Sequence, residues 1–235
     1  MKKLAVISSG TKGIGRATVE KFHKEGFDVA TCSRNMKDLL ALKKELEGKN
    51  GVGSIYVKVA DMSDSKQLTD FADFVKDLNQ PVDVLVNNTG VFLPGAVHEE
   101  EEGSLEKMIE TNLYSAYYLT RAFINDMKER REGHVFTTGS IAGIQAYANG
   151  GSYSISKFAL HGFTKALRAE MMDFGVRVTS LLAGATYTAS WEGVELSEDR
   201  FMKASDIADA IYSANALSKH TVVEEILLRP QLGDI

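Results

Sequence analysis

Short apolar runs rich in β-branched residues alternate along the chain with longer stretches in which apolar residues recur at helical spacing. A run that is apolar at nearly every position is typical of a parallel strand buried on both faces, since a half-exposed strand would alternate apolar with polar residues. The alternation predicts an α/β fold, a doubly wound parallel sheet of about seven strands with helices on both faces. The predicted strands are residues 3–8, 28–33, 53–59, 82–87, 134–139, 177–182 and 221–228.

Nothing in the sequence divides this alternation into parts. Its 235 residues are 44% hydrophobic, which is enough for one sizeable core, and only three prolines interrupt them. Chains of this type and length commonly form one domain. We therefore expect a single domain, residues 1–235, that binds its ligands at the carboxyl ends of the strands.

Charge and cysteine content narrow the function and the compartment. The net charge is −5, without a basic run long enough to follow a phosphate backbone, so nucleic acid is not expected as a partner. No segment approaches the length of a membrane span, and the first apolar run is too short for a signal peptide, so we expect a cytoplasmic protein with no membrane partner. The one cysteine, Cys32, excludes an internal disulfide, and the five histidines lack paired spacing, so no metal site is expected.

The segment "SSGTKGIGRA" lies between the first predicted strand and a helix expected to begin near Gly13. Glycines at 10, 13 and 15 would let backbone N–H groups approach a pyrophosphate closely. Alone this is a weak signal, because any tight strand-to-helix turn favours glycine. Two further polar segments, "DMS" at 61–63 and "NNTG" at 87–90, end the next strands at the same edge and favour a nucleotide site there.

Five motifs occur in a fixed order: "SSGTKGIG", "NNTG", Asn112, Ser140 and "YSISK". In order and spacing the chain resembles the short-chain dehydrogenase/reductase family, in its compact single-domain branch with a Rossmann-type fold. The resemblance covers nearly the whole chain. Ser140 lies 13 residues before Tyr153, which lies four before Lys157, a spacing that fits ketoreductases rather than the family's enoyl reductases.

Three positions depart from the family pattern. The family usually has glycine, alanine and proline where this chain has Ser9, Thr89 and Ala183. None of these changes removes a catalytic group. They bear on how tightly the cofactor binds.

The resemblance implies a catalytic role for each of four residues. Tyr153 would be the general acid/base, Lys157 its tuner and a ribose ligand, Ser140 the group that orients the carbonyl, and Asn112 the holder of a water that relays protons. Ser140 follows a predicted strand, so its hydroxyl would stand at the ligand edge, although a serine there is also typical of a turn or a helix N-cap. A Ser/His/Asp hydrolase is not favoured, because "TGSIAG" lacks the G-x-S-x-G elbow.

Residues four apart on a helix share a face, so Tyr153 and Lys157 are expected to project together. An ammonium about 4 Å from a phenol stabilises the phenolate by roughly 4 kcal/mol, which would lower a tyrosine pKa of about 10 by about 3 units. The spacing thus predicts a pKa for Tyr153 near neutrality, less whatever desolvation opposes. The alternative is an exposed pair on a solvated helix.

The end of the second strand bears on the choice of cofactor. An NAD-dependent enzyme usually places an acidic residue there, whereas this chain has Ser33 and Arg34, with a further cation at Lys12. Missing negative charge and added positive charge favour the 2′-phosphate of NADP(H). Asp61 is expected to accept from the adenine amino group, with Met62 beside the ring. The full set of predicted cofactor ligands is Ser9, Gly10, Lys12, Gly13, Ile14, Gly15, Ser33, Arg34, Asp61, Met62, Asn88, Gly90, Tyr153, Lys157, Gly184 and Thr186.

The expected activity is NADP(H)-dependent hydride transfer between nicotinamide and a small carbonyl or secondary alcohol. A nucleotide-sensing regulatory protein on the same fold is the alternative. Residues 98–103, "HEEEEG", are expected to form a solvated loop. The resemblance also bears on partners, because acyl-carrier-protein reductases of the family often carry a basic residue where this chain has Phe174. An acidic carrier protein is therefore a less expected partner, although Arg130 and Arg131 leave it open. The stretch from Thr186 to Lys203 contains Tyr187, Trp191 and Phe201, which would form either a small lid or ordinary packing.

Two long helical stretches, 104–131 and 151–175, carry more apolar residues than one buried stripe requires. Pairing of these helices across a two-fold axis, as the family commonly does, would bury the remainder. The tail at 227–235 would add a second contact. We therefore expect a homo-oligomer, with a tetramer favoured over a dimer.

Overall fold

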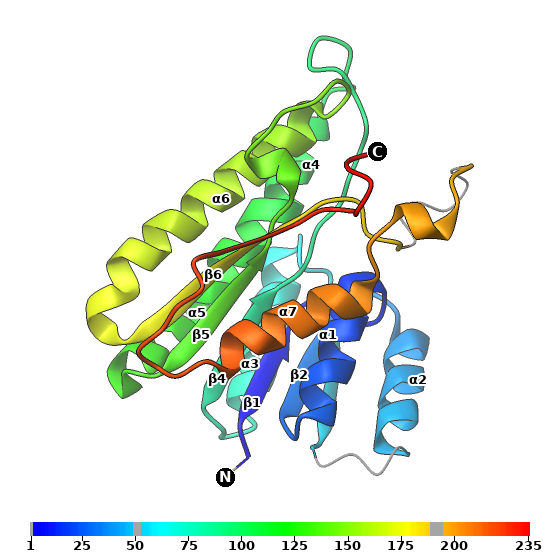
Figure 1. Ribbon diagram of the computed structural model, residues 1–235. Helices are drawn as coiled ribbons and strands as arrows, with labels where there is room; N and C mark the ends of the chain where they lie inside the picture. The colour runs from blue at the N-terminus through cyan, green and yellow to red at the C-terminus, as the bar shows by residue number, and fades with distance from the viewer. Residues whose placement is uncertain (1, 49–52, 189–194) are drawn as a thin grey trace.

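Seven strands form one sheet in the order β3-β2-β1-β4-β5-β6-β7, and every neighbouring pair is parallel (Figure 1). This computed structural model describes residues 2–48, 53–188 and 195–235. The predicted fold class is confirmed, and the largest shift is in the last strand, which begins at Glu225 instead of 221. The strands are β1 Leu4–Ile7, β2 Asp28–Ser33, β3 Ile55–Val59, β4 Val82–Asn87, β5 Gly133–Thr138, β6 Val176–Ala183 and β7 Glu225–Leu228.

The strand order runs outward from the centre of the sheet on both sides, and the point where it reverses determines where a ligand site forms. β1 pairs with β2 on one side and with β4 on the other, so the strand order reverses between β1 and β4. In doubly wound sheets a crevice opens at such a point beyond the carboxyl ends of the strands. The glycine-rich segment follows β1 and the "NNTG" segment follows β4, so the fold brings them together there.

Helices cover both faces of the sheet, and each face has its own hydrophobic cluster. Side chains of α3, α5 and α6 pack on one face, and side chains of α1, α2 and α7 pack on the other, where Figure 1 shows α7 in front of the sheet. Of the helices described, none combines the length and the apolar composition that a bilayer crossing requires. The helices are α1 Gly13–Lys24, α2 Met36–Glu47, α3 Ser65–Lys76, α4 Ser104–Ile109, α5 Ser115–Arg130, α6 Gly151–Met171 and α7 Ala204–Ala216.

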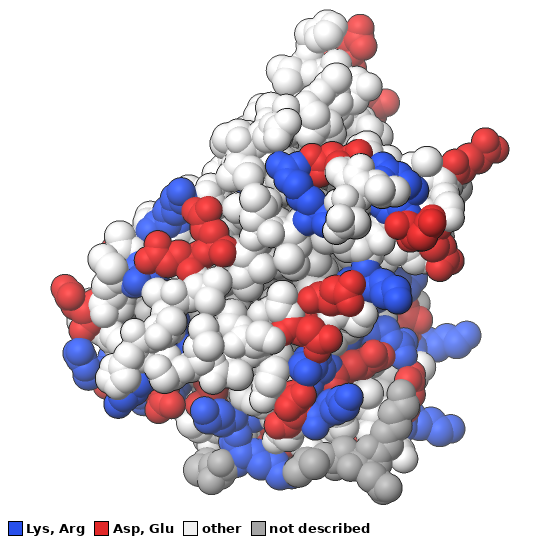
Figure 2. All heavy atoms as spheres, viewed as in Figure 1, with Lys and Arg blue, Asp and Glu red and all other residues white. Residues whose placement is uncertain are grey.

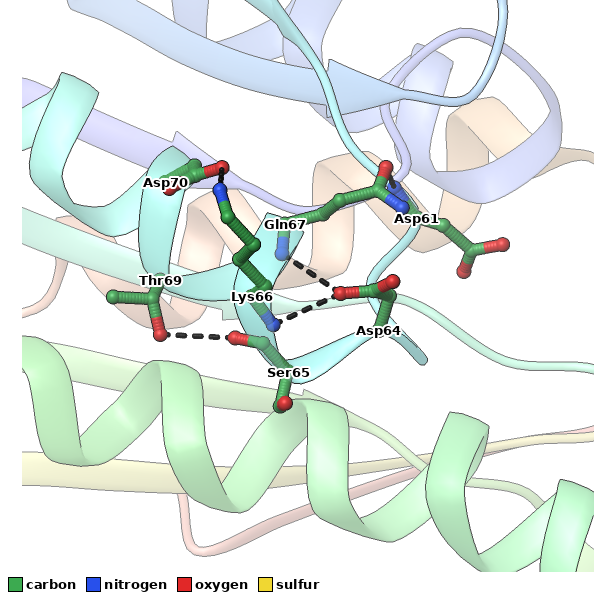
Figure 3. Close-up of polar contacts among 7 residues, drawn as sticks. All are labelled: Asp61, Asp64, Ser65, Lys66, Gln67, Thr69 and Asp70. Carbon is green, nitrogen blue, oxygen red and sulfur yellow. Dashed lines mark hydrogen bonds and ion pairs between the residues drawn. The ribbon is translucent and has the colours of Figure 1, made fainter.

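Local sequence signals explain where two of these helices begin. Asn35 accepts hydrogen bonds from the backbone N–H groups of residues 37 and 38 at the start of α2. Asp64 does the same for residues 66 and 67 at the start of α3, as Figure 3 shows. Such side chains satisfy N–H groups that the first helical turn leaves without partners, which stabilises a helix by about 1 kcal/mol.

The helical stretch expected at 104–131 is helical from Ser104 to Arg130, but it is not one regular α-helix. A π-helical turn, Glu110–Tyr114, separates α4 from α5. It contains Asn112, which is fully buried and uses both ends of its amide. Single π-turns are often found at functional sites, because the extra residue displaces a side chain from the regular helical face.

Candidate active site

Three glycines after β1 are each required by close packing or by backbone conformation. A Cβ on Gly10 would lie 2.2 Å from the Thr31 hydroxyl, and one on Gly15 would lie 2.4 Å from the Ser9 carbonyl oxygen. Gly13 has a φ of +53°, which favours glycine. α1 begins at Gly13, as expected, with no side-chain cap and no acidic residue in its first turn. Its first N–H groups are therefore suited to an anionic group such as a pyrophosphate.

Two of the three family departures touch each other across this edge. Ser9 has a φ of 55°, and its hydroxyl lies 2.8 Å from the hydroxyl of Thr89. Thr89 Oγ1 also donates to Ser8 Oγ over 3.0 Å, and Ser8 Oγ accepts from two backbone N–H groups after β4. A left-handed serine costs about 1 kcal/mol, which one hydrogen bond of about that strength offsets. The Ser9 side chain is thus directed toward Thr89 at the end of β4.

The residues expected to select the cofactor lie at the end of β2. Arg34 and Lys12 are exposed, and neither forms an ion pair with a described residue. Ser33 Oγ donates to the Asn35 carbonyl over 3.2 Å. Two cations without carboxylate partners, beside a strand end without an acidic residue, fit a 2′-phosphate.

Asp61 and Met62, the residues expected on the adenine side of the site, follow the end of β3. Asp61 Oδ1 accepts from the backbone N–H and the hydroxyl of Ser63, and the Asp61 N–H donates to Gln67. Figure 3 shows the Asp61 carboxylate pointing away from the cap of α3. The Met62 side chain packs in the core and is 3% exposed, and its expected place beside the adenine ring stays a prediction.

Several predicted cofactor ligands serve first to hold the loops. Asn88 Nδ2 donates to the carbonyl oxygens of Ser8 and Ser9, so it fixes the glycine-rich segment to the end of β4. The Gly184 N–H donates to the Leu228 carbonyl, and the Thr186 hydroxyl donates to the Gly184 carbonyl. These loops converge on the ligand edge of the sheet.

Ser140 and Tyr153 come together at the end of β5. The Ser140 side chain lies close enough to the Tyr153 hydroxyl to lower the pKa of the phenol, and Ser140 Oγ accepts from the Ala142 N–H over 3.1 Å. Ser140 is therefore both the cap of a 3₁₀ turn and a partner of the tyrosine, so the two readings of this serine are compatible. Phe92 packs edge-on against Tyr153, with ring centres 4.9 Å apart.

Lys157 lies one helical turn after Tyr153 on α6, and it is only 4% exposed. Its ammonium lies 5.7 Å from the centre of the Tyr153 ring and donates to the Thr138 carbonyl over 3.0 Å. The i,i+4 prediction thus places the two side chains side by side. This contact lies at the carboxyl end of β5, because Thr138 is the last residue of that strand.

The pKa predicted for Tyr153 is wrong in direction. Burial raises the pKa of Tyr153 to about 12, although the hydrogen bond with Ser140 opposes this. Burial likewise lowers the pKa of Lys157 to about 8. Desolvation penalises both charged forms, and it is the largest cause of each shift. Tyr153 is thus protonated at neutral pH, the state in which a phenol donates a proton.

The side-chain amide of Asn112 connects the loop after β4 to α6. Its Oδ1 accepts from the Val91 N–H over 2.7 Å, and its Nδ2 donates to the Val91 carbonyl and to Ser156 Oγ. A Cβ on Gly90 would lie 3.4 Å from both Asn112 Oδ1 and Lys157 Nζ, so amide and ammonium flank the same small space. The role of Asn112 as holder of a relay water stays a prediction.

Sequence reasoning missed the residues that support this group. Ser156 contacts Asn112 and Phe92 contacts Tyr153, but no motif marks either residue. The solvated-loop prediction for residues 98–103 is wrong at Glu100, whose carboxylate binds Ser152 at the start of α6. One signal was available for Glu100: α6 begins after Gly150, which has no side chain to cap it, so an acceptor from elsewhere in the chain was needed.

The expected lid is described at its two ends. The Tyr187 N–H donates to the Met202 carbonyl, and the ring centres of Tyr187 and Phe201 are 5.7 Å apart. Phe201 is buried, as expected of a packing residue. Tyr187 is 48% exposed, as a lid residue would be. Trp191 lies outside the described residues.

Within the described part of the chain, no group of three or more His, Cys, Asp or Glu side chains is placed to hold a metal ion. The chemistry that this site supports is proton transfer by Tyr153 to a group bound between the glycine-rich segment and α6. Figure 2 shows that the upper left side of this view, over the first turns of α6, is mostly free of charged side chains, whereas acidic side chains stand at the upper right edge.

Comparison with known proteins agrees with this arrangement. The sepiapterin reductase of Chlorobaculum tepidum is 32% identical over 244 residues, which cover 100% of this chain and 99% of that protein. An alcohol dehydrogenase from the archaeon Thermococcus sibiricus, solved with 5-hydroxy-NADP, is 26% identical with a TM-score of 0.90 and covers 98% of this chain and 97% of that one. A metagenomic short-chain oxidoreductase solved with NADP is 28% identical with a TM-score of 0.85, over 97% of both chains. The family model for short chain dehydrogenases matches residues 3–199, so the chain belongs to the short chain dehydrogenase family.

Proposed function

We propose that this oxidoreductase uses NADP(H) to interconvert a small carbonyl compound and the corresponding secondary alcohol, with Tyr153 as general acid/base. The observation that carries the proposal is the group formed by Tyr153, Ser140 and Lys157 at the end of β5, opposite the glycine-rich segment. Two similar proteins were solved with NADP or an NADP derivative. The exposed cations Lys12 and Arg34 support NADP(H) over NAD(H).

Reduced nicotinamide, when bound, supplies the hydride. The protein's part is to bind, orient and protonate. Ser140 would donate to the carbonyl oxygen as negative charge develops there, and Tyr153 would give that oxygen its proton. Lys157 would then stabilise the phenolate left on Tyr153, and the dry surroundings strengthen that interaction.

The test is a carbonyl screen that follows loss of NADPH absorbance with diacetyl, benzil and ethyl acetoacetate as probes. Tyr153→Phe keeps the ring and deletes the hydroxyl, so turnover should fall by about 10²- to 10⁴-fold while NADPH binding persists. Near-normal turnover in that variant would refute the role of Tyr153. NADPH binding without oxidation by any probe would favour the nucleotide-sensing alternative.

We also propose a cytoplasmic homo-oligomer that works as a single domain. The lone Cys32 is buried, and burial raises its pKa to about 12, which suits a thiol kept reduced and inert. On α5 and α6 the side chains of Tyr117 and Phe158 are 36% and 46% exposed, which supports pairing of these helices with a second copy. Phe123 and Leu160, on the same two helices, are buried within this chain.

A further inference from the structure

Glu100 is half-buried, whereas the other residues of the run 98–103 are exposed. Its Oε1 accepts from the Ser152 N–H over 2.8 Å, and its Oε2 accepts from the Ser152 hydroxyl. Ser152 is 2% exposed and immediately precedes Tyr153. The carboxylate thus binds the first turn of the catalytic helix from a loop 52 residues earlier in the chain.

α6 needs such a partner. Its N-cap, Gly150, has no side chain, and its own first turn contains no acidic residue. Helix N-termini leave N–H groups unpaired and carry partial positive charge, which a carboxylate stabilises. Glu100 supplies both the acceptor and the charge.

The surrounding glycines show that the carboxylate has a defined seat. A Cβ on Gly151 would lie 2.1 Å from Glu100 Oε1, and a Cβ on Gly95 would lie 2.6 Å from Glu100 Cγ. Gly151 also has a φ of +23°. The Gly95 N–H donates to the Asn149 carbonyl over 3.0 Å, so the loop also pairs with the backbone just before α6. Any side chain at these positions would displace Glu100.

The same loop forms one side of the reaction centre. Its first residue, Val91, is held by Asn112, and its second, Phe92, packs against the Tyr153 ring. The loop is thus attached at Val91, at Gly95 and at Glu100. Release at Glu100 would free both Phe92 and the first turn of α6, the two elements that set where the Tyr153 hydroxyl lies.

We propose that Glu100 is a positioning residue for the reaction at Tyr153: its carboxylate locks the loop that carries Phe92 to the first turn of α6. The inference rests on the proposed function of Tyr153. A displacement of about 1 Å at a reacting group costs up to about 10²-fold in rate, so loss of this contact lowers kcat even though Glu100 touches no substrate. Cofactor affinity depends mainly on the glycine-rich segment and should change little.

The test compares Glu100→Ala with Glu101→Ala, which removes an equal charge from an exposed neighbour. With benzil, diacetyl and NADPH as probes, Glu100→Ala should lower kcat about tenfold or more while the NADPH Kd stays within about threefold of wild type. Glu101→Ala should match wild type. Glu100→Gln keeps an oxygen for the Ser152 N–H and should restore most of kcat. A cap that only stabilises α6 would lower Tm and leave kcat unchanged, which would overturn the proposal.

Amide hydrogen exchange tests the lock without turnover. Glu100→Ala should speed exchange in residues 91–97 and 152–157 together, and Glu101→Ala should speed neither. Unchanged exchange in both segments would also overturn the proposal. If Glu100→Ala does not fold, Ser152→Ala carries the same comparison, because it deletes only the hydroxyl contact and should lower kcat by about threefold or more. Tyr153→Phe runs in parallel: full activity there refutes the proposed function, whereas an inactive Tyr153→Phe beside an unimpaired Glu100→Ala refutes only the lock.

Discussion

Replacement of Lys157 by methionine should make the cofactor-free protein more stable. Lys157 is 4% exposed, and burial lowers its pKa from 10.5 to about 8. At about 1.36 kcal/mol per pKa unit, holding the charged form in this site costs the folded state about 3 kcal/mol at neutral pH. Methionine fills similar space without charge. It loses the hydrogen bond to the Thr138 carbonyl, about 1 kcal/mol, so we expect a net gain of about 2 kcal/mol.

The gain should depend on pH in a defined direction. The pKa of Lys157 is lower in the folded state than in the unfolded state, so between about pH 8 and pH 10.5 the unfolded chain binds more protons. The unfolding free energy of the wild type therefore rises with pH across this window. The advantage of Lys157→Met should shrink by about 1 kcal/mol between about pH 7 and about pH 9.

Urea unfolding followed by circular dichroism at the two pH values measures both effects. Lys165→Met on the same helix is the matched control, because its ammonium is largely exposed and pairs with Glu225 over 3.1 Å. That variant should change stability by less than about 0.5 kcal/mol at either pH. A less stable Lys157→Met protein, or an advantage that does not vary with pH, would refute the reasoning that burial of this ammonium strains the free enzyme.

Four further outcomes are expected. Arg34→Ala should weaken NADPH by about 1.5 to 3 kcal/mol and leave NADH nearly unaffected in fluorescence titrations, and an equal loss for both would show that Arg34 does not contact the 2′-phosphate. In a double-mutant cycle of Ser9→Gly and Thr89→Ala, urea unfolding should give a coupling of about 1 kcal/mol from their 2.8 Å contact, and a coupling near zero would mean that the hydroxyls do not bind each other. His134 is buried and its pKa is lowered well below 6.5, so its unfolded form binds more protons below that pH; stability should fall by up to about 2 kcal/mol by about pH 5, and an equal fall in His134→Gln would assign the loss elsewhere. Light scattering after size exclusion should give a multiple of 25.7 kDa that Phe158→Glu reduces, whereas a monomeric wild type would contradict helix pairing.

The sequence by itself determined the fold and the order of the site. Continuous apolar runs specify strands that must be covered on both faces, and helical stretches between them leave few arrangements other than a doubly wound parallel sheet. The position of Gly13 after the first strand located the start of α1. The spacing of Tyr153 and Lys157 placed both on one helical face, because helical periodicity is a local property of the backbone.

Only the tertiary structure decided the energetics and the supporting contacts. The pKa of Tyr153 rises instead of falling, because desolvation depends on what packs around the phenol and not on its neighbours in sequence. The contact between Ser9 and Thr89 joins residues 80 positions apart, and the one between Glu100 and Ser152 joins residues 52 apart. Asn112 lies in a π-turn, which the sequence pattern did not reveal, and from there it bonds to Val91 and Ser156. Hydrogen bonds and burial depend on distances of a few ångströms, and the pattern along a chain does not contain those distances until the sheet and helices have packed.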